Sequence, residues 1–147
     1  IENGLSNFEE KKLTFKQFIN FSNEIIKLNL PFIVCEKNKL VVGFAFLNKF
    51  RNKSGYKYSF ENSIYIDKDY TGIGIGSKLL KNLINTAKKN PKIKNIIAVI
   101  GNESSQRSIK LHKKNGFNIV GTLKKVGYKK KQWLDAIYMQ KIIDEKD

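Results

Sequence analysis

The residues best suited to chemistry form a glycine-rich turn near the middle of the chain. Gly72, Gly74 and Gly76 stand at alternate positions between Thr71 and Ser77, and an amphipathic segment follows at once. Glycines at this spacing let the backbone turn sharply and bring its N–H groups close to a ligand. The free N–H groups and the dipole at the start of a helix attract an anion. The turn predicts a phosphate or pyrophosphate site, and the alternative is a turn without a ligand.

Two common phosphate-binding loops do not match this turn. A Walker A loop requires Lys and then Ser or Thr after its last glycine, but Gly76 is followed by Ser77 and then Lys78. A dinucleotide fingerprint requires G-x-G-x-x-G, but Gly74 and Gly76 are followed by Ser77, Lys78 and Leu79. The residues alone therefore leave the identity of the anion open.

Two other side chains are candidates for acid–base work. Glu61 stands at the start of an apolar run over 60–66, where a carboxylate is either a general base or a solvated group at a strand end. His112 is the only histidine and falls on a short predicted helix. An imidazole titrates in a range useful for proton transfer, although a lone histidine on a helix is more often structural. Both readings stay open for each residue.

The elements that must position these residues alternate between helix and strand. Helical spacing of apolar residues predicts helices over 14–28, from the glycine turn to Pro91, and over 105–115, with Gly116 as the C-terminal cap of the last. Apolar runs predict strands over 32–35, 40–47, 60–66, 96–100, 118–121 and 133–142. The continuous run 96–100 is typical of a strand buried on both faces. This order predicts one mixed α/β domain over residues 1–147.

Composition narrows the class of protein only in part. The chain has 28 Lys and Arg against 13 Asp and Glu, a net charge of +15, which favours partners that carry several negative charges. The lysines are spread along the chain, so this charge alone does not select a function. The apolar runs are strand-sized, and no secretory signal opens the chain, which argues against a membrane protein. The single cysteine, Cys35, is expected in the core and favours a cytoplasmic setting.

Five segments downstream of the turn carry a resemblance to a known family. These are Ile97–Gly101, Leu111–Phe117, Gly121–Leu123, Val126–Lys129 and Trp133–Asp135. In order and spacing they resemble the phosphinothricin / methionine sulfoximine acetyltransferases of the GNAT superfamily, over about residues 7–142. The glycine turn resembles that superfamily's acetyl-CoA motif, R/Q-x-x-G-x-G/A. Thr71 replaces the usual Arg or Gln, and Ser105 stands where Asn often contacts the cofactor.

The resemblance implies a fold and a reaction. The fold is the α/β GNAT acyl-CoA N-acyltransferase fold with a mixed sheet, whose first strand and most of whose first helix are expected before Ile1. The enzyme moves acetyl from acetyl-CoA, without a metal, to the α-amino group of a small amino acid analogue of the phosphinothricin, methionine sulfoximine or methionine sulfone type. Glu61 matches the family's catalytic glutamate. His112 occupies the position of a tyrosine that protonates the departing thiolate in many members.

The same resemblance assigns binding residues. Cofactor contacts are implied for Ile64, Tyr65, Ile66, Thr71, Gly72, Ile73, Gly74, Ile75, Gly76, Ser77, Ser105 and Ser108. Substrate contacts are implied for Arg51, Lys53, Tyr56 and Tyr128. A homodimer is implied through the segment that contains Lys124, Tyr128, Lys129 and Trp133, beside the substrate pocket.

Two alternative functions remain at this point. A GNAT enzyme could acetylate a protein N-terminus or another amine instead of a free amino acid analogue. The lysines at 124, 125 and 129–131, interleaved with Tyr128 and Trp133, could instead contact phosphates and bases of a nucleic acid. That second reading leaves the glycine turn and Glu61 unexplained, so a nucleic-acid partner is not expected.

Overall fold

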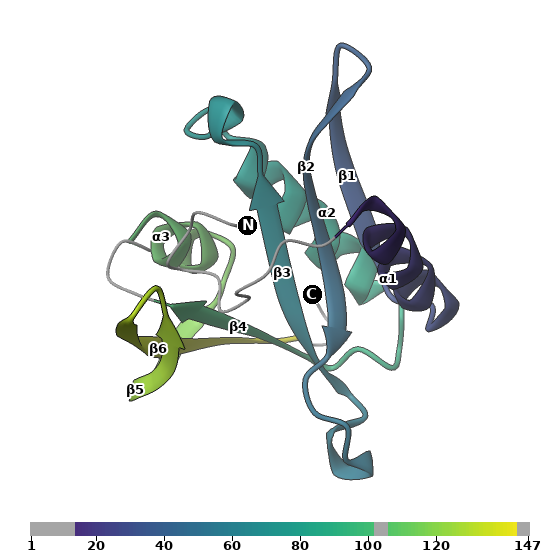
Figure 1. Cartoon of the computed structure of the whole chain (residues 1–147). Coiled ribbons are helices and arrows are strands. Elements are labelled where there is room, and N and C mark those ends of the chain that lie inside the picture. Colours follow the sequence, from purple (N-terminus) through teal and green to yellow (C-terminus); the bar gives the residue numbers. More distant parts are fainter. Residues whose placement is uncertain (1–13, 102–105, 144–147) are drawn as a thin grey trace.

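A six-stranded mixed sheet carries three helices in the part of the chain that the structure, a computed structural model, describes: residues 14–101 and 106–143 (Figure 1). The strand order is β1-β2-β3-β4-β6-β5. All neighbours are antiparallel except β3 and β4, which are parallel. The elements are α1 (Phe15–Lys27), β1 (Phe32–Lys37), β2 (Leu40–Lys49), the short helix η1 (Ser54–Tyr56), β3 (Ser59–Ile66), the short helix η2 (Lys68–Tyr70), α2 (Ile75–Lys88), β4 (Asn95–Gly101), α3 (Gln106–Lys114), β5 (Asn118–Lys129) and β6 (Gln132–Ile142).

The helices α1 and α2 cover opposite faces of the sheet, as Figure 1 shows. Phe44 of β2 packs edge-on against Phe18 of α1, with ring centroids 5.2 Å apart. At the preceding position, a Cβ added to Gly43 would lie 3.2 Å from the side chain of Leu79 in α2. Since successive residues of a strand point to opposite faces, these two contacts place one helix on each side.

The core lies mainly between the sheet and α2. The apolar positions of α2 recur at helical spacing and are buried: Leu79, Leu80, Leu83, Ile84 and Ala87. They meet buried residues of the neighbouring strands, among them Leu47, Ile96 and Met139. This packing holds the first turn of α2, and with it the glycine turn, in a fixed place relative to β3 and β4.

The strands β3 and β4 pair over only three residues and then separate. Their parallel register joins Ser59 to Asn95, Phe60 to Ile96 and Glu61 to Ile97. Beyond Glu61, β3 stays paired with β2 as far as Ile66, while β4 follows β6 away from it. Figure 1 shows the two strands diverging from this point. The sheet therefore opens between β3 and β4, and Glu61 is the last residue of β3 that is paired with β4.

The predicted mixed α/β fold is confirmed, with two corrections. The strand predicted over 118–121 continues to Lys129, because Asp135 of β6 stabilises an irregularity there by accepting the backbone N–H of Lys125 at 2.9 Å. The expectation that 96–100 is buried on both faces is wrong. Ile96, Ala98 and Ile100 are buried, but Ile97 and Val99 are only half-buried, because none of the described helices covers their face.

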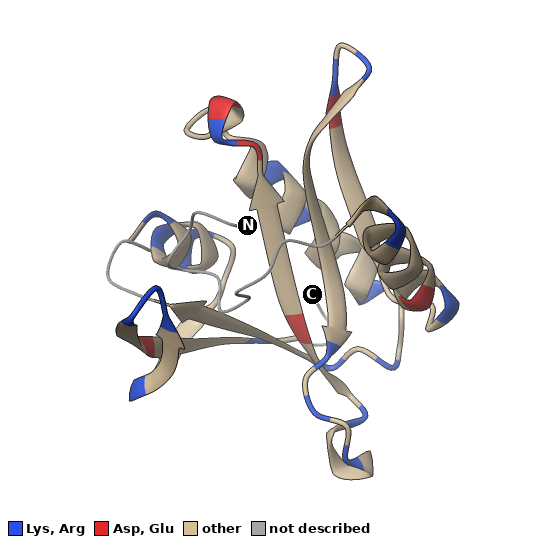
Figure 2. Ribbon diagram, viewed as in Figure 1, with Lys and Arg blue, Asp and Glu red and all other residues tan. Residues whose placement is uncertain are grey.

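Three further features bear on the expectations. Cys35 packs at the margin of the core and is half-buried. No helix in the described ranges combines the length and the apolar character needed to cross a bilayer. Figure 2 shows Lys and Arg scattered over most elements, so the positive charge does not mark a single face.

Candidate active site

Glu61 occupies the point at which the sheet opens. The ring of Tyr65 contacts Phe44, which packs against α1, so Tyr65 lies on the α1 face of the sheet. Because side chains alternate along β3, the side chain of Glu61, four residues earlier, lies on the same face. The carboxyl group is half-buried, and this partial desolvation raises its pKa above the usual range of a glutamate. The positive charge of Arg51 opposes the shift and lowers the pKa by a smaller amount. A carboxylate whose proton affinity is raised in this way is suited to accept a proton near neutral pH.

Arg51 is held beside Glu61 by an aromatic neighbour. Its guanidinium carbon lies 4.3 Å from the centroid of the Phe50 ring, and its Nη1 donates to the Phe50 carbonyl at 3.0 Å. The Phe50 ring also contacts Tyr56 edge-on, with ring centroids 5.9 Å apart. A stacked guanidinium keeps its outer N–H groups available for a carboxylate or phosphinate. Phe50 was not among the predicted site residues; an aromatic residue directly before Arg51 was the only signal.

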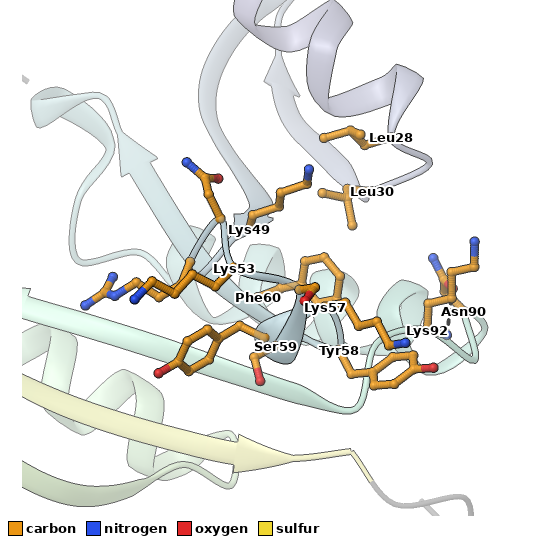
Figure 3. A pocket seen from close by; sticks show the side chains of 14 residues that line it. Leu28, Leu30, Lys49, Lys53, Lys57, Tyr58, Ser59, Phe60, Asn90 and Lys92 are labelled. Carbon is orange, nitrogen blue, oxygen red and sulfur yellow. Dashed lines mark hydrogen bonds between the residues drawn. The ribbon is translucent and has the colours of Figure 1, made fainter.

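The predicted substrate residues Arg51, Lys53 and Tyr56 all line one cavity of about 500 Å³. Figure 3 shows the side chains around it, which come from the β2–β3 connection, the end of α1 and the segment after α2. Five cationic side chains line the cavity and, among its described lining residues, no acidic one does: Lys49, Arg51, Lys53, Lys57 and Lys92. The apolar side chains of Leu30 and Phe60 also line it. Such a wall suits an acceptor that carries negative charge.

The open edge of β3 offers backbone hydrogen-bonding groups. The N–H of Asp67 donates to Val42 at 2.8 Å, and the N–H of Phe50 donates to Ser59 at 3.3 Å, which fixes the phase of the β2–β3 ladder. In this phase the odd-numbered residues of β3 pair with β2, so Ile64 and Ile66 direct their N–H and C=O groups toward the side that β4 has left. An extended chain with amide groups could pair there as an added strand.

The glycine turn has the backbone geometry of an anion site. Gly72 and Gly74 have φ values of 78° and 89°, and nothing lies within 4 Å of a Cβ added at either position. Gly74 is the N-cap of α2, and no side chain caps this helix start. The first intrahelical bond is donated by Lys78, so the N–H groups of the preceding turn remain available. The residues present therefore fit a phosphate group.

The other residues of the turn have distinct places. Ile73 is exposed, Ile75 is buried and Ser77 is half-buried. Thr71 donates its hydroxyl to the Lys68 carbonyl at 3.2 Å, so it stabilises the preceding turn. Gly76 packs inward, because a Cβ there would lie 3.0 Å from Ile66 and 3.4 Å from Leu111 of α3. The third glycine therefore permits close packing.

His112 lies on the other face of the sheet from Glu61. It is 4% exposed, and both ring nitrogens have protein partners. Nδ1 lies 2.7 Å from the Ser108 carbonyl, and Nε2 lies 3.1 Å from Nδ2 of Asn62. Burial lowers the pKa of His112, and the hydrogen bond to the Ser108 backbone opposes this shift. This geometry favours the structural alternative for His112.

The predicted site residues fall into groups. Arg51, Lys53 and Tyr56 line the cavity, and Glu61, which is not among its described lining residues, is linked to them by the charge of Arg51. At the glycine turn, Gly76 lies against Ile66 of β3 and Leu111 of α3. Tyr128 is not part of this group: it lies on β5, separated from β3 by β4 and β6, with its ring 5.0 Å from Trp133. Ser105 lies outside the described residues. In these described ranges no three His, Cys, Asp or Glu side chains are placed to hold a metal ion.

Comparison with known proteins agrees with this architecture. The model of the acetyltransferase (GNAT) family matches residues 4–117. The chain is 31% identical to the phosphinothricin N-acetyltransferase of Alcaligenes faecalis over 147 residues, which is all of this chain and 74% of that protein. It is 37% identical to the L-methionine sulfoximine/L-methionine sulfone acetyltransferase of Salmonella typhimurium over 119 residues, 80% of this chain and 68% of that one.

A solved structure gives the same result in three dimensions. The yncA protein of Salmonella typhimurium, whose structure was determined with its cofactor acetyl-CoA, superposes with a TM-score of 0.93 at 28% identity. The superposition covers 98% of this chain and 82% of that one. With the family model matching most of its length, the chain belongs to the acetyltransferase (GNAT) family.

Proposed function

We propose that this enzyme transfers the acetyl group of acetyl-CoA to the α-amino group of a small amino acid analogue of the phosphinothricin, methionine sulfoximine or methionine sulfone type. The observation that carries the proposal is the position of Glu61. Its half-buried carboxyl, of raised pKa, stands where β3 leaves β4 and is influenced by the charge of Arg51, which lines the cationic cavity. The names of the two relatives support the acceptor class.

Acetyl-CoA fits the other side of the opening. The N–H groups at the start of α2 and the positive φ of Gly72 and Gly74 suit its diphosphate. The amide-bearing arm of the molecule would run along Ile64 and Ile66, on the edge of β3 that β4 has left. Bound there, acetyl-CoA supplies an activated acyl group at the end of the arm. A cytoplasmic setting, where thiols such as Cys35 stay reduced, accords with such a substrate.

The protein's own groups then have defined tasks. Glu61 accepts a proton from the acceptor's ammonium group, directly or through a water molecule, and so makes the nitrogen nucleophilic. A backbone N–H of Ile64 or Ile66 stabilises negative charge that develops on the acyl oxygen. Arg51 binds the acceptor's carboxylate and so orients its amine toward the opening. The nitrogen bonds to the acyl carbon, and the C–S bond breaks when the tetrahedral intermediate collapses. The second proton that the nitrogen loses passes through water to the departing coenzyme A thiolate, which is a fair leaving group.

The direct test is an acceptor screen. Purified full-length protein is mixed with acetyl-CoA and each of methionine sulfoximine, methionine sulfone and phosphinothricin, and release of the coenzyme A thiol is followed. Turnover of at least one acceptor, with the acetylated product identified by mass spectrometry, is expected. An N-terminal peptide and a polyamine serve as comparison acceptors. Turnover of one of these, with no turnover of the three amino acid analogues, would reject the acceptor class while keeping the acetyl donor.

Replacing Arg51 by Leu should raise the KM for the acceptor about tenfold or more, because a charge-assisted hydrogen bond contributes about 1.5–3 kcal/mol. The KM for acetyl-CoA should change little. The pKa of Glu61 should rise further, since Arg51 lowers it in the wild type, so the acidic limb of kcat/KM moves to higher pH. Lys88→Leu, on the exposed face of α2, removes the same charge as a control. Equal acceptor KM values in the two variants would contradict this role.

We also propose that two copies associate through the β5–β6 hairpin. Large apolar side chains are exposed on it beside several lysines, with Tyr128 at 51%, Trp133 at 63% and Val120 at 63%. Since Tyr128 is remote from Glu61 in one chain, association is the way in which it would reach a pocket. Sedimentation velocity at tens of micromolar should give the mass of two chains, and Trp133→Glu should give one. A monomer in the wild type would contradict the association.

A further inference from the structure

Asn62 is a buried polar residue at the point where β3 separates from β4. It directly follows Glu61, the last residue paired with β4, and lies on the opposite face of the sheet. The side chain is 7% exposed, and its Nδ2 lies 3.1 Å from Nε2 of His112. The other residues of β3 on this face are apolar, such as Phe60 and Ile64. A buried amide among these apolar side chains must be compensated by hydrogen bonds, which indicates a specific role.

The direction of the hydrogen bond follows from the other nitrogen of the same ring. Nδ1 of His112 lies 2.7 Å from the carbonyl oxygen of Ser108, which can only accept, so Nδ1 carries the hydrogen. Nε2 of the neutral ring then has a lone pair, and Asn62 donates an N–H to it. Phe117 packs edge-on against the ring at 5.0 Å, and the site is buried, so the neutral form is favoured.

The helix α3 contacts both sides of the opening, through this hydrogen bond on one side and through apolar packing on the other. His112 contacts β3 through Asn62, and the preceding residue, Leu111, packs against the first turn of α2 at Gly76. Consecutive residues of α3 thus connect the helix that follows the glycine turn to the strand that carries Glu61. The distance between the proposed diphosphate site and the proposed base therefore depends on where α3 sits.

The amide of Asn62 is also incompletely used. Among the described residues, the Nε2 of His112 is the one hydrogen-bond partner of this side chain. A buried amide has two N–H donors and an acceptor oxygen, and buried polar groups are normally satisfied. The remaining donor and the oxygen therefore have no hydrogen-bond partner within the part of the chain that the structure describes.

We propose that Asn62 is a positioning residue for the acetyl transfer: by donating to His112 it fixes α3 and sets the separation between the glycine turn and Glu61. The inference rests on the proposed function, because it concerns where the acyl group sits relative to the acceptor amine. A merely structural amide would affect thermal stability and the form of the His112 ring, but not kcat in the folded enzyme.

The first test reads the histidine directly. His112 is the only histidine of the chain, so its ring ¹⁵N signals need no assignment by mutagenesis. Spectra of the wild-type protein at neutral pH should show Nδ1 protonated and Nε2 unprotonated. A ring protonated at Nε2, alone or together with Nδ1, would overturn the proposal. This measurement requires no turnover.

The second test changes the donor at constant size. In Asn62→Asp an ionised carboxylate can only accept, so Nε2 must take a proton and the ring becomes doubly protonated. Asn62→Leu removes the hydrogen bond. Both variants should lose at least tenfold in kcat, while the KM for acetyl-CoA stays within threefold. If Asn62→Leu does not fold, the kcat of Asn62→Asp and the ¹⁵N spectrum of its His112 ring test the positioning role.

A matched control comes from the same helix. The Asn115 side chain donates an N–H to the Leu111 carbonyl at 2.8 Å, whereas its contact with His112 is a backbone hydrogen bond that a leucine would keep. Asn115→Leu therefore removes a side-chain hydrogen bond within α3 and leaves the His112 ring contacts in place. Two results would overturn the positioning role of Asn62. One is a loss of kcat in Asn115→Leu as large as that in Asn62→Leu, and the other is a wild-type kcat in Asn62→Asp. Absence of turnover in the wild type would reject the proposed function, whereas a wrong ring form in an active enzyme rejects the role of Asn62 alone.

Discussion

Replacing Glu61 by Gln should lower kcat/KM roughly 100-fold or more, because positioned acid–base groups contribute about 10²–10⁴ to the rate. The amide keeps the shape of the side chain but cannot take a proton from the acceptor's ammonium group. In the wild type, activity should fall as pH decreases through the pKa of Glu61, which burial places above the ordinary carboxyl range. The Gln variant should lack this acidic limb. Thiol-release rates measured across pH in both proteins check the prediction.

The substitution should not destabilise the fold. Burial raises the pKa of Glu61, which means that its ionised form is disfavoured in the folded state at neutral pH. Gln is neutral at every pH, so the Tm at neutral pH should be unchanged or slightly higher. Glu24→Gln on the exposed face of α1 serves as the control and should keep wild-type kinetics. A Glu61→Gln enzyme within threefold of the wild type, with the same pH profile, would mean that another group is the base.

The order of elements was predictable because the apolar patterns are strong. The spacing of Leu79, Leu83 and Ala87 identified α2, and Pro91 and the glycine turn identified its limits. The end of β5 was not predictable, since Lys124 and Lys125 have no apolar alternation. Their place in the strand depends on Asp135, which lies ten residues after Lys125 and accepts its backbone N–H. Pairing of this kind depends on register, which a local pattern does not contain.

The site was predictable where a residue has one dominant local role. The positive φ at Gly72 and Gly74 follows from the spacing of the turn, and Arg51 and Glu61, which the resemblance assigns to one segment, are near enough for the charge of Arg51 to lower the pKa of Glu61. The partner of His112 was not predictable. Asn62 is fifty residues away in the sequence, and strand alternation places it on the face opposite Glu61. The point where β3 leaves β4 also needs the three-dimensional path of β6, which carries β4 away.

Replacing Gly74 by Ala should weaken acetyl-CoA binding about tenfold. The φ of 89° at Gly74 is unfavourable for a residue with a Cβ, with a strain of roughly 1–2 kcal/mol. Nothing lies within 4 Å of the added Cβ, so the change acts through the backbone and not through a clash. The turn relieves the strain by rotating, and the N–H groups at the start of α2 no longer converge on one anion. Isothermal titration calorimetry with acetyl-CoA measures the loss.

The chemical cause can be separated from a general loss of structure by the choice of ligand and of control. Gly121→Ala, on β5, also adds a Cβ into open space but at a residue without positive φ, so its affinity should equal that of the wild type. If the turn binds the diphosphate, Gly74→Ala should weaken acetyl-CoA but leave acetyl-pantetheine, which lacks phosphates, unaffected. An equal loss for both ligands would place the effect at the β3 edge, because only the pantetheine arm is common to the two. Unchanged affinity for acetyl-CoA would mean that the backbone of this turn does not hold the anion.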